Sequence, residues 1–155
     1  LIWLERLKDC GYEGIFCNFE IFDPKLRVEL MPAKGRLPLE LYQKNWQKGL
    51  ELFGPGKVST MIIAGLGEDP NSLIEGVEGA ISLGVNTSVV PFMPIKGSKL
   101  AHLSPPSFEY MAHIYRQVNK IYQKYQREPF GNQIVCRQGD CFTAVKDVWV
   151  MGIEE

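Results

Sequence analysis

One stretch near the middle of the chain, Met61 to Pro70, most constrains what this sequence can fold into. A short apolar run leads into Gly65-Leu66-Gly67, and Glu68-Asp69-Pro70 follows. The apolar run predicts a buried strand, and the glycines predict a tight turn. The Asp-Pro pair predicts a helix start, because Asp caps helix N-termini and Pro is tolerated in the first turn. This order is typical of α/β proteins, which bind ligands in the loops at the carboxyl ends of their strands.

The same alternation of strands and helices extends over most of the chain. We predict strands over residues 14–20, 58–64 and 87–91, and helices over residues 1–10, 38–53, 70–83 and 108–126. Residues 21–35 and 92–103 are predicted to be loops. Alternating elements imply right-handed crossovers and a parallel sheet. Since three strands alone would leave open edges, we predict an α/β fold that is part of a (β/α) TIM-type barrel.

Composition excludes several classes of function. The 155 residues are 45% hydrophobic and carry a net charge of −1, which gives no electrostatic reason to expect nucleic acid or an anionic membrane as a partner. No apolar run approaches the roughly 20 residues that cross a bilayer. Four cysteines do not make a disulfide framework, so we expect a cytoplasmic protein with reduced thiols. The chain starts at Leu1 rather than Met, and we expect it to be a piece of a longer protein.

Three segments at the predicted strand ends carry the candidate site residues. The Gly65–Glu68 turn is either a tight connection or a place where backbone approaches a nucleotide or cofactor. Asn18 and Glu20 are predicted to point to the same side of the first strand. They form either a clamp for vicinal hydroxyls or an amine, or a cap for the strand end. The Pro94–Leu100 loop is either rigid packing or a cover for a substrate or cofactor.

In this order, the three segments resemble the C-terminal half of a radical S-adenosylmethionine (SAM) enzyme of the biotin-synthase-like type. That type includes biotin synthase, hydrogenase maturases and methylornithine synthase. Asn18-Phe19-Glu20 resembles the strand end that holds SAM, and Ile62 to Glu68 partly matches a GxIxGxGE motif without its first glycine. Pro94 to Leu100 matches a P-x-x-G-[ST]-x-L loop. The resemblance covers about residues 12–126.

The resemblance implies how this segment meets the polar parts of SAM. Asn18 and Glu20 would contact the ribose hydroxyls or the amino group of SAM. Lys34 or Arg36, on the loop that follows, would meet its carboxylate.

The resemblance also implies a surface for adenine. The backbone from Ile63 to Gly65, and at Val90 on the next strand, would lie beside the adenine ring. In this interpretation Glu68 is a residue of the turn and of the helix entry rather than a catalytic base. No catalytic residue is assigned.

One expected motif is absent from the sequence. Radical SAM enzymes hold a [4Fe–4S] cluster with the thiolates of a CxxxCxxC loop, and this chain contains no such spacing. We therefore expect the cluster ligands either in an N-terminal half of the barrel that is missing from this sequence or in another chain, and we expect the fragment alone to be inactive. Residues 129–155 are predicted to be a tail that contains Cys136 and Cys141. This pair would ligate an auxiliary cluster or zinc, form a disulfide, or simply pack in a turn, since two ligands are half a site.

We therefore predict that residues 1–128 are the C-terminal half of a radical SAM barrel. They would supply SAM-binding strands and one wall of a cavity in which 5′-deoxyadenosyl-radical chemistry acts on a small-molecule substrate. One alternative is a different (β/α) barrel enzyme that binds a phosphate at Gly65–Gly67, with Glu20 or Glu68 as general base. Another is a non-catalytic barrel remnant that serves as a binding module.

Overall fold

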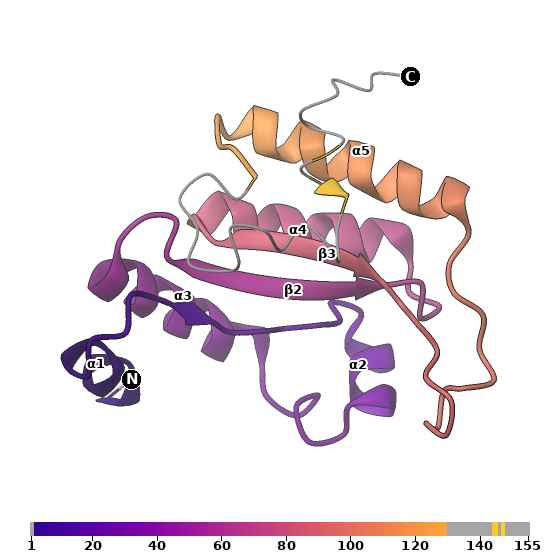
Figure 1. Ribbon diagram of the computed structural model, residues 1–155, viewed down its shortest axis with the longest axis horizontal. Helices are drawn as coiled ribbons and strands as arrows, with labels where there is room; N and C mark the ends of the chain where they lie inside the picture. The colour runs from indigo at the N-terminus through magenta and orange to yellow at the C-terminus, as the bar shows by residue number, and fades with distance from the viewer. Residues whose placement is uncertain (1, 130–143, 146, 148–155) are drawn as a thin grey trace.

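The structure is a computed structural model that describes residues 2–129, 144–145 and 147 of the chain. Its strands are β1 (Ile15–Phe16), β2 (Val58–Ala64) and β3 (Asn86–Pro91). They form one parallel sheet in the order β1-β2-β3 (Figure 1). Parallel strands in sequence order confirm the predicted α/β class. The arrangement is consistent with a partial β/α fold, and the described residues form an open sheet rather than a closed barrel.

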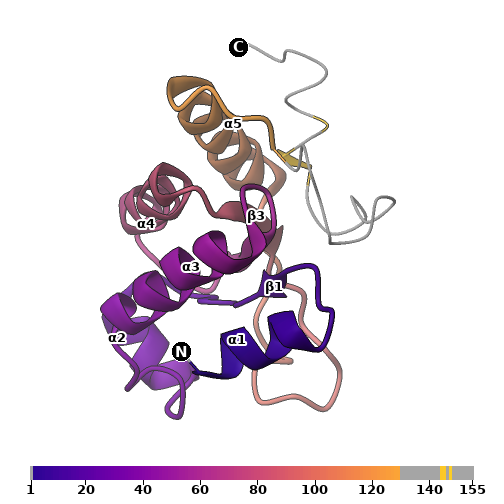
Figure 2. The same cartoon turned by 90° about the vertical axis from the view of Figure 1, so that its left-hand side faces the viewer.

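In the described part of the chain, five helices connect and cover the strands. They are α1 (Ile2–Asp9), α2 (Pro24–Leu30), α3 (Leu39–Phe53), α4 (Pro70–Leu83) and α5 (Phe108–Lys124). Figure 2 shows α3 and α4 on the same side of the sheet, and α5 packs against α4. Among the described residues, the helices are all too short or too polar to cross a membrane.

The main core lies between the sheet and the helices on this side. Alternate residues of β2 face the helices and are fully buried; they are Val58, Thr60, Ile62 and Ala64. Trp46 of α3 is also buried, and its indole N–H donates to the carbonyl of Cys17 at 3.1 Å. At Gly49 a Cβ would lie 2.8 Å from Ile15 Cδ1. The close approach of α3 to the sheet therefore requires glycine at this position.

The first strand differs from the prediction. Only Ile15–Phe16 form a strand, and farther along an isolated bridge pairs Glu20 with Ile62. Glu20 lies four positions after Phe16, whereas their partners Ser59 and Ile62 are three positions apart. The extra residue interrupts the ladder, and the amide of Phe19 donates instead to a side chain, that of Thr60, at 3.0 Å. The direction of Asn18 relative to Glu20 therefore does not follow from simple alternation.

The loop predicted over residues 21–35 is wrong in part, because it contains helix α2. Asp23 caps this helix by accepting hydrogen bonds from the amides of Lys25 and Leu26, both at 2.9 Å, and Pro24 occupies the first turn. The same Asp-Pro signal at Asp69-Pro70 correctly predicted α4. Helix α2 was missed because a helix of seven residues is too short to show an apolar period.

The remaining elements agree with the prediction to within two residues at each end. Gly84 ends α4 in the left-handed conformation, with φ of 102°. Ser107 caps α5 by accepting from the amide of Tyr110 at 3.1 Å. Cys136 and Cys141 lie outside the described residues, so their proposed roles stay predictions.

Candidate functional site

The predicted site residues Glu20, Ile63 and Val90 meet in one row at the carboxyl end of the sheet. The amide of Ile63 donates to the carbonyl of Glu20 at 2.8 Å, and Ile63 is paired in register with Val90. Just past the end of β3, the amide of Phe92 donates to the carbonyl of Ala64, the last residue of β2, at 2.7 Å and continues this edge. Figure 1 shows β2 and β3 pointing the same way, with α2 below this end of the sheet. Residues far apart in sequence thus form one surface.

Glu20 has an unusual backbone conformation in this row. Its φ is 73°, a region that residues other than glycine rarely occupy. Hydrogen bonds hold it on both sides, because its amide donates to the carbonyl of Met61 at 3.0 Å and its carbonyl accepts from Ile63. Its neighbours Phe19 and Ile21 are buried in the protein. Strained residues held this firmly are frequent at ligand sites, so Glu20 is the first candidate here.

The carboxylate of Glu20 is paired with a lysine on the turn after α2. Lys34 Nζ lies 2.8 Å from Glu20 Oε1, and the Glu20 side chain is 16% exposed. The turn is packed tightly, since a Cβ on Gly35 would lie 2.7 Å from the carbonyl oxygen of Arg27. Arg36 follows on the same turn and is exposed. Of the two basic candidates, the structure brings Lys34 to Glu20.

Asn18 also belongs to this segment. Its side-chain oxygen Oδ1 is buried and accepts no hydrogen bond from the described part of the chain. A buried acceptor without a donor is costly. The position therefore suits a ligand that supplies a hydroxyl or N–H group.

The glycine turn after β2 is held by Glu68. Gly65 and Gly67 have φ values of 94° and 100°, as the tight-turn interpretation requires. Glu68 is 9% exposed, and its carboxylate accepts from the amides of Gly65 at 2.6 Å and Leu66 at 2.7 Å. Two of the amides that a phosphate at this turn would use are thus bound by a carboxylate of the same chain. This geometry does not favour the phosphate-binding alternative.

Tyr110 of α5 completes this arrangement and had no assigned role in the sequence analysis. Its hydroxyl donates to Glu68 Oε1 at 2.5 Å. Burial, followed by the hydrogen bond to Glu68, raises the pKa of Tyr110 above its usual range. The hydroxyl therefore stays protonated and remains a donor at physiological pH. A tyrosine in the first turn of a helix carries no sequence signal for such a contact across 42 residues.

Arg27 is the second residue that sequence reasoning missed. It is 2% exposed, and its guanidinium carbon lies 3.8 Å from the ring centroid of Phe19 and 5.0 Å from that of Tyr42. All three guanidinium nitrogens are buried without a hydrogen-bond partner among the described residues. Arginines are almost never this buried unless they are paired. The sequence around Arg27 therefore did not predict that its side chain is buried.

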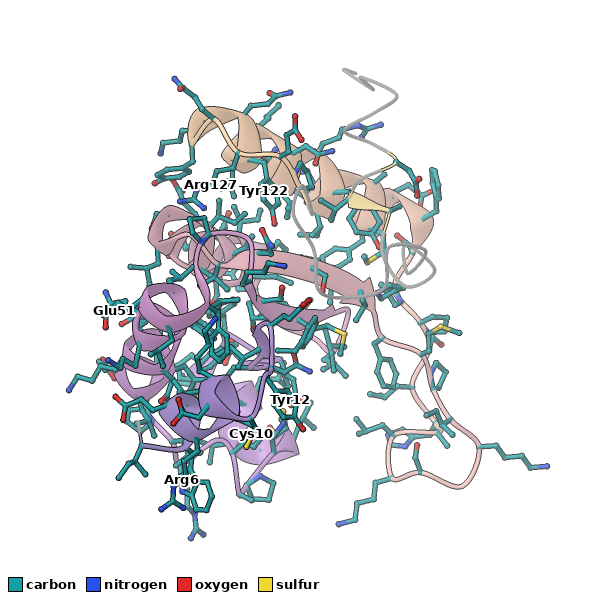
Figure 3. The ribbon with its side chains drawn as sticks, turned by 60° about the vertical axis from the view of Figure 1, so that its left-hand side comes forward. Arg6, Cys10, Tyr12, Glu51, Tyr122 and Arg127 are labelled. Atoms are coloured by element: carbon teal, nitrogen blue, oxygen red, sulfur yellow. The ribbon has the colours of Figure 1, made fainter. Side chains whose placement is uncertain are left out.

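The described residues do not fit an iron–sulfur cluster. They contain no group of three or more His, Cys, Asp or Glu side chains that would hold a metal ion. Cys10 is exposed at the end of α1, beside Tyr12 in Figure 3. Cys17 is half-buried, and burial raises the pKa of its thiol, which disfavours the thiolate that metals bind. Cluster ligands would have to come from elsewhere.

Comparison with known proteins gives one informative match. The chain is 29% identical over 125 residues to bacteriochlorophyllide c C-7(1)-hydroxylase from Chlorobaculum limnaeum. The match covers 79% of this chain and 31% of that protein, so the chain spans about a third of the length of its relative. No family model and no solved structure matches the chain. The match relates the chain to an enzyme and is consistent with a radical SAM relationship, without singling out biotin synthase.

Proposed function

We propose that this chain is part of a radical SAM enzyme and that the carboxyl end of its sheet binds SAM. The observation that carries this proposal is the Glu20–Lys34 ion pair, which lies at the end of the Glu20–Ile63–Val90 row. The relative also supports the proposal, because a hydroxylase replaces a C–H bond with a C–OH bond. Radical chemistry is suited to such bonds. The match does not single out one member of the class, so the proposal is limited to radical SAM enzymes.

The ion pair suits the amino acid end of SAM. That end carries an ammonium and a carboxylate, and Glu20 and Lys34 carry the two complementary charges 2.8 Å apart. In the bound state Glu20 would accept from the SAM ammonium, and Lys34 would turn its Nζ to the SAM carboxylate. Each charge would thus exchange one ionic partner for another, so neither is left unpaired at the site.

The adenosine end would follow the row of strand ends. Asn18 Oδ1, which lacks a donor within the described segment, would accept from a ribose hydroxyl. The partly buried side chains of Ile63 and Val90 and the backbone at Gly65 would lie against adenine. Arg36, exposed on the neighbouring turn, would remain in solvent.

SAM, held at a reduced [4Fe–4S] cluster, supplies the radical that removes a hydrogen atom from a substrate in this class of enzyme. We propose that an N-terminal half of the barrel provides the cluster ligands and that a small organic molecule is the substrate. This chain would bind and orient SAM and form one wall of the substrate cavity.

The test measures ligand binding at the proposed SAM site and does not require the radical reaction. The protein would be expressed from its complete reading frame, and the binding of S-adenosylhomocysteine, a stable analogue of SAM, would be measured by calorimetry. We expect Lys34→Met and Glu20→Gln each to weaken binding by about tenfold to a hundredfold, because each removes a charge-assisted contact. Lys44→Met, which removes an exposed lysine on α3, is the matched control and should leave binding unchanged. Absence of binding by the unmodified protein would contradict the proposal.

A further inference from the structure

The first turn of α5 contacts the glycine turn at two points. Tyr110 donates its hydroxyl to Glu68, whose carboxylate in turn holds the amides of Gly65 and Leu66. Pro106, just before the helix, lies directly on Gly65, where a Cβ would be 2.5 Å from the proline Cβ. One contact acts through hydrogen bonds and the other through packing. Both fix the backbone that follows β2.

The position of α5 itself is fixed at its other end. The hydroxyl of Tyr122 accepts from the amide of Thr87 at 2.9 Å and donates to the carbonyl of Thr87 at 3.1 Å. Thr87 lies near the start of β3, and Figure 3 shows Tyr122 on the side of α5 that faces α4 and the sheet. Tyr122 is 1% exposed. The helix is therefore bound to the amino end of β3 and to the turn that follows the neighbouring strand β2, which makes it a rigid support.

We infer that Tyr110, acting through Glu68 and together with Pro106, is a positioning residue for the adenine of bound SAM. This inference rests on the proposed function. The peptide groups at Gly65 and Leu66 present their amides to Glu68, so their orientation is set before any ligand arrives. A surface that is already ordered binds with a smaller entropic cost. Without the Tyr110 hydroxyl, the buried carboxylate loses its only described side-chain donor, and the turn gains freedom.

The experiment separates the two ends of the ligand. Binding of 5′-methylthioadenosine, which lacks the amino acid end, and of S-adenosylhomocysteine would be measured by calorimetry on the complete protein. We expect Tyr110→Phe to weaken both ligands equally, by about threefold to tenfold, as loss of one hydrogen bond predicts. Lys34→Met should weaken S-adenosylhomocysteine alone. This split is a signature that a general loss of structure would not produce.

Tyr125→Phe is the matched control on the same helix. Its hydroxyl donates to Glu78 at 3.2 Å, at the contact between α4 and α5 rather than at the glycine turn. It should lower the unfolding midpoint about as much as Tyr110→Phe while leaving 5′-methylthioadenosine affinity unchanged. Pro106→Ala removes the ring that lies on Gly65 without touching the carboxylate, and it should weaken 5′-methylthioadenosine in the same direction as Tyr110→Phe.

The outcomes separate this inference from the proposed function. If the unmodified protein binds neither ligand, the proposed function fails. If it binds both, and folded Tyr110→Phe and Pro106→Ala proteins bind 5′-methylthioadenosine as tightly as the unmodified protein, the positioning role is overturned while the SAM site stands. If Tyr110→Phe does not fold, Pro106→Ala decides by the same measurement.

Discussion

The guanidinium of Arg27 lies 3.8 Å from the ring centroid of Phe19, in the core between α2 and α3. Phe19 also packs edge-on against Tyr42 and Trp46 of α3, with ring centroids 4.9 Å and 6.4 Å away. Because Phe19 directly precedes Glu20, this cluster supports the backbone of the candidate site. The Arg27 guanidinium therefore makes a cation–π contact with Phe19, and it has no hydrogen-bond acceptor among the described residues.

We expect Arg27→Met to stabilise the protein. A desolvated cation–π contact contributes roughly 2 kcal/mol, whereas burial of a charge without hydrogen-bond partners costs several kcal/mol. Methionine has a flexible chain that fills similar space without the charge. The free energy of unfolding should therefore rise by about 1–2 kcal/mol in a urea titration.

The control for this substitution is Arg36→Met, at an exposed position on the turn after α2. It should change the free energy of unfolding by less than about 0.5 kcal/mol. A protein destabilised by Arg27→Met would contradict the expectation. It would indicate that an acceptor outside the described residues binds the guanidinium.

The contact between α4 and α5 should depend on pH at both extremes. Hydrogen bonds from Lys124 and then Tyr125 lower the pKa of Glu78, and the hydrogen bond to Glu78 raises the pKa of Lys124. The depressed Glu78 pKa gives a contribution to the free energy of unfolding that is present above the ordinary value of 4.5 and is lost as pH falls through the folded-state value. The raised Lys124 pKa gives a second contribution to the free energy of unfolding, which is present below the ordinary value of 10.5 and is lost as pH rises through the folded-state value.

Glu78→Gln tests this dependence. The difference in unfolding midpoint between the unmodified protein and this variant should be small near neutral pH, because Lys124 is exposed, Glu78 is partly exposed, and solvent screens both charges. It should vanish in strong acid and decline again in strong alkali. A difference that stays constant across the whole range would count against the ion pair as its cause.

The two described cysteines should differ in reactivity. Cys10 is exposed, whereas Cys17 is half-buried with a raised pKa caused mainly by burial. Since the thiolate is the reactive form, iodoacetamide should modify Cys10 first and Cys17 much more slowly at neutral pH. Mass spectrometry of the digested protein would follow both sites, and the rates should converge in denaturant. Faster labelling of Cys17 in the folded protein would contradict the described burial.

Local signals in the sequence were enough to predict most elements. The apolar run of β2, the Asp69-Pro70 helix start and the Gly84 helix end act over a few neighbouring residues, and the structure confirms them. They also placed Ile63 and Val90 at the same edge, because parallel strands aligned by their connections end together.

Other features depend on contacts between distant residues and could not be read in this way. The extra residue before Glu20 follows from the bond between Phe19 and the Thr60 side chain, 41 residues away. The Tyr110–Glu68 contact requires the packing of α5 to be known. Helix α2 is different, since its Asp23-Pro24 signal was present in the sequence and a short helix with a single apolar turn was not recognised.

The two glycines of the turn after β2 should respond differently to alanine. Both have positive φ, so Gly65→Ala and Gly67→Ala should each cost about 1–2 kcal/mol in backbone strain. A Cβ on Gly67 meets open space, whereas one on Gly65 would lie 2.5 Å from Pro106 Cβ and force the segment before α5 to move. Gly65→Ala should therefore lower the free energy of unfolding by a further 1–3 kcal/mol, roughly the cost of overpacking. Equal losses in parallel urea titrations would show that Pro106 yields without cost and that its contact with Gly65 does not hold the turn.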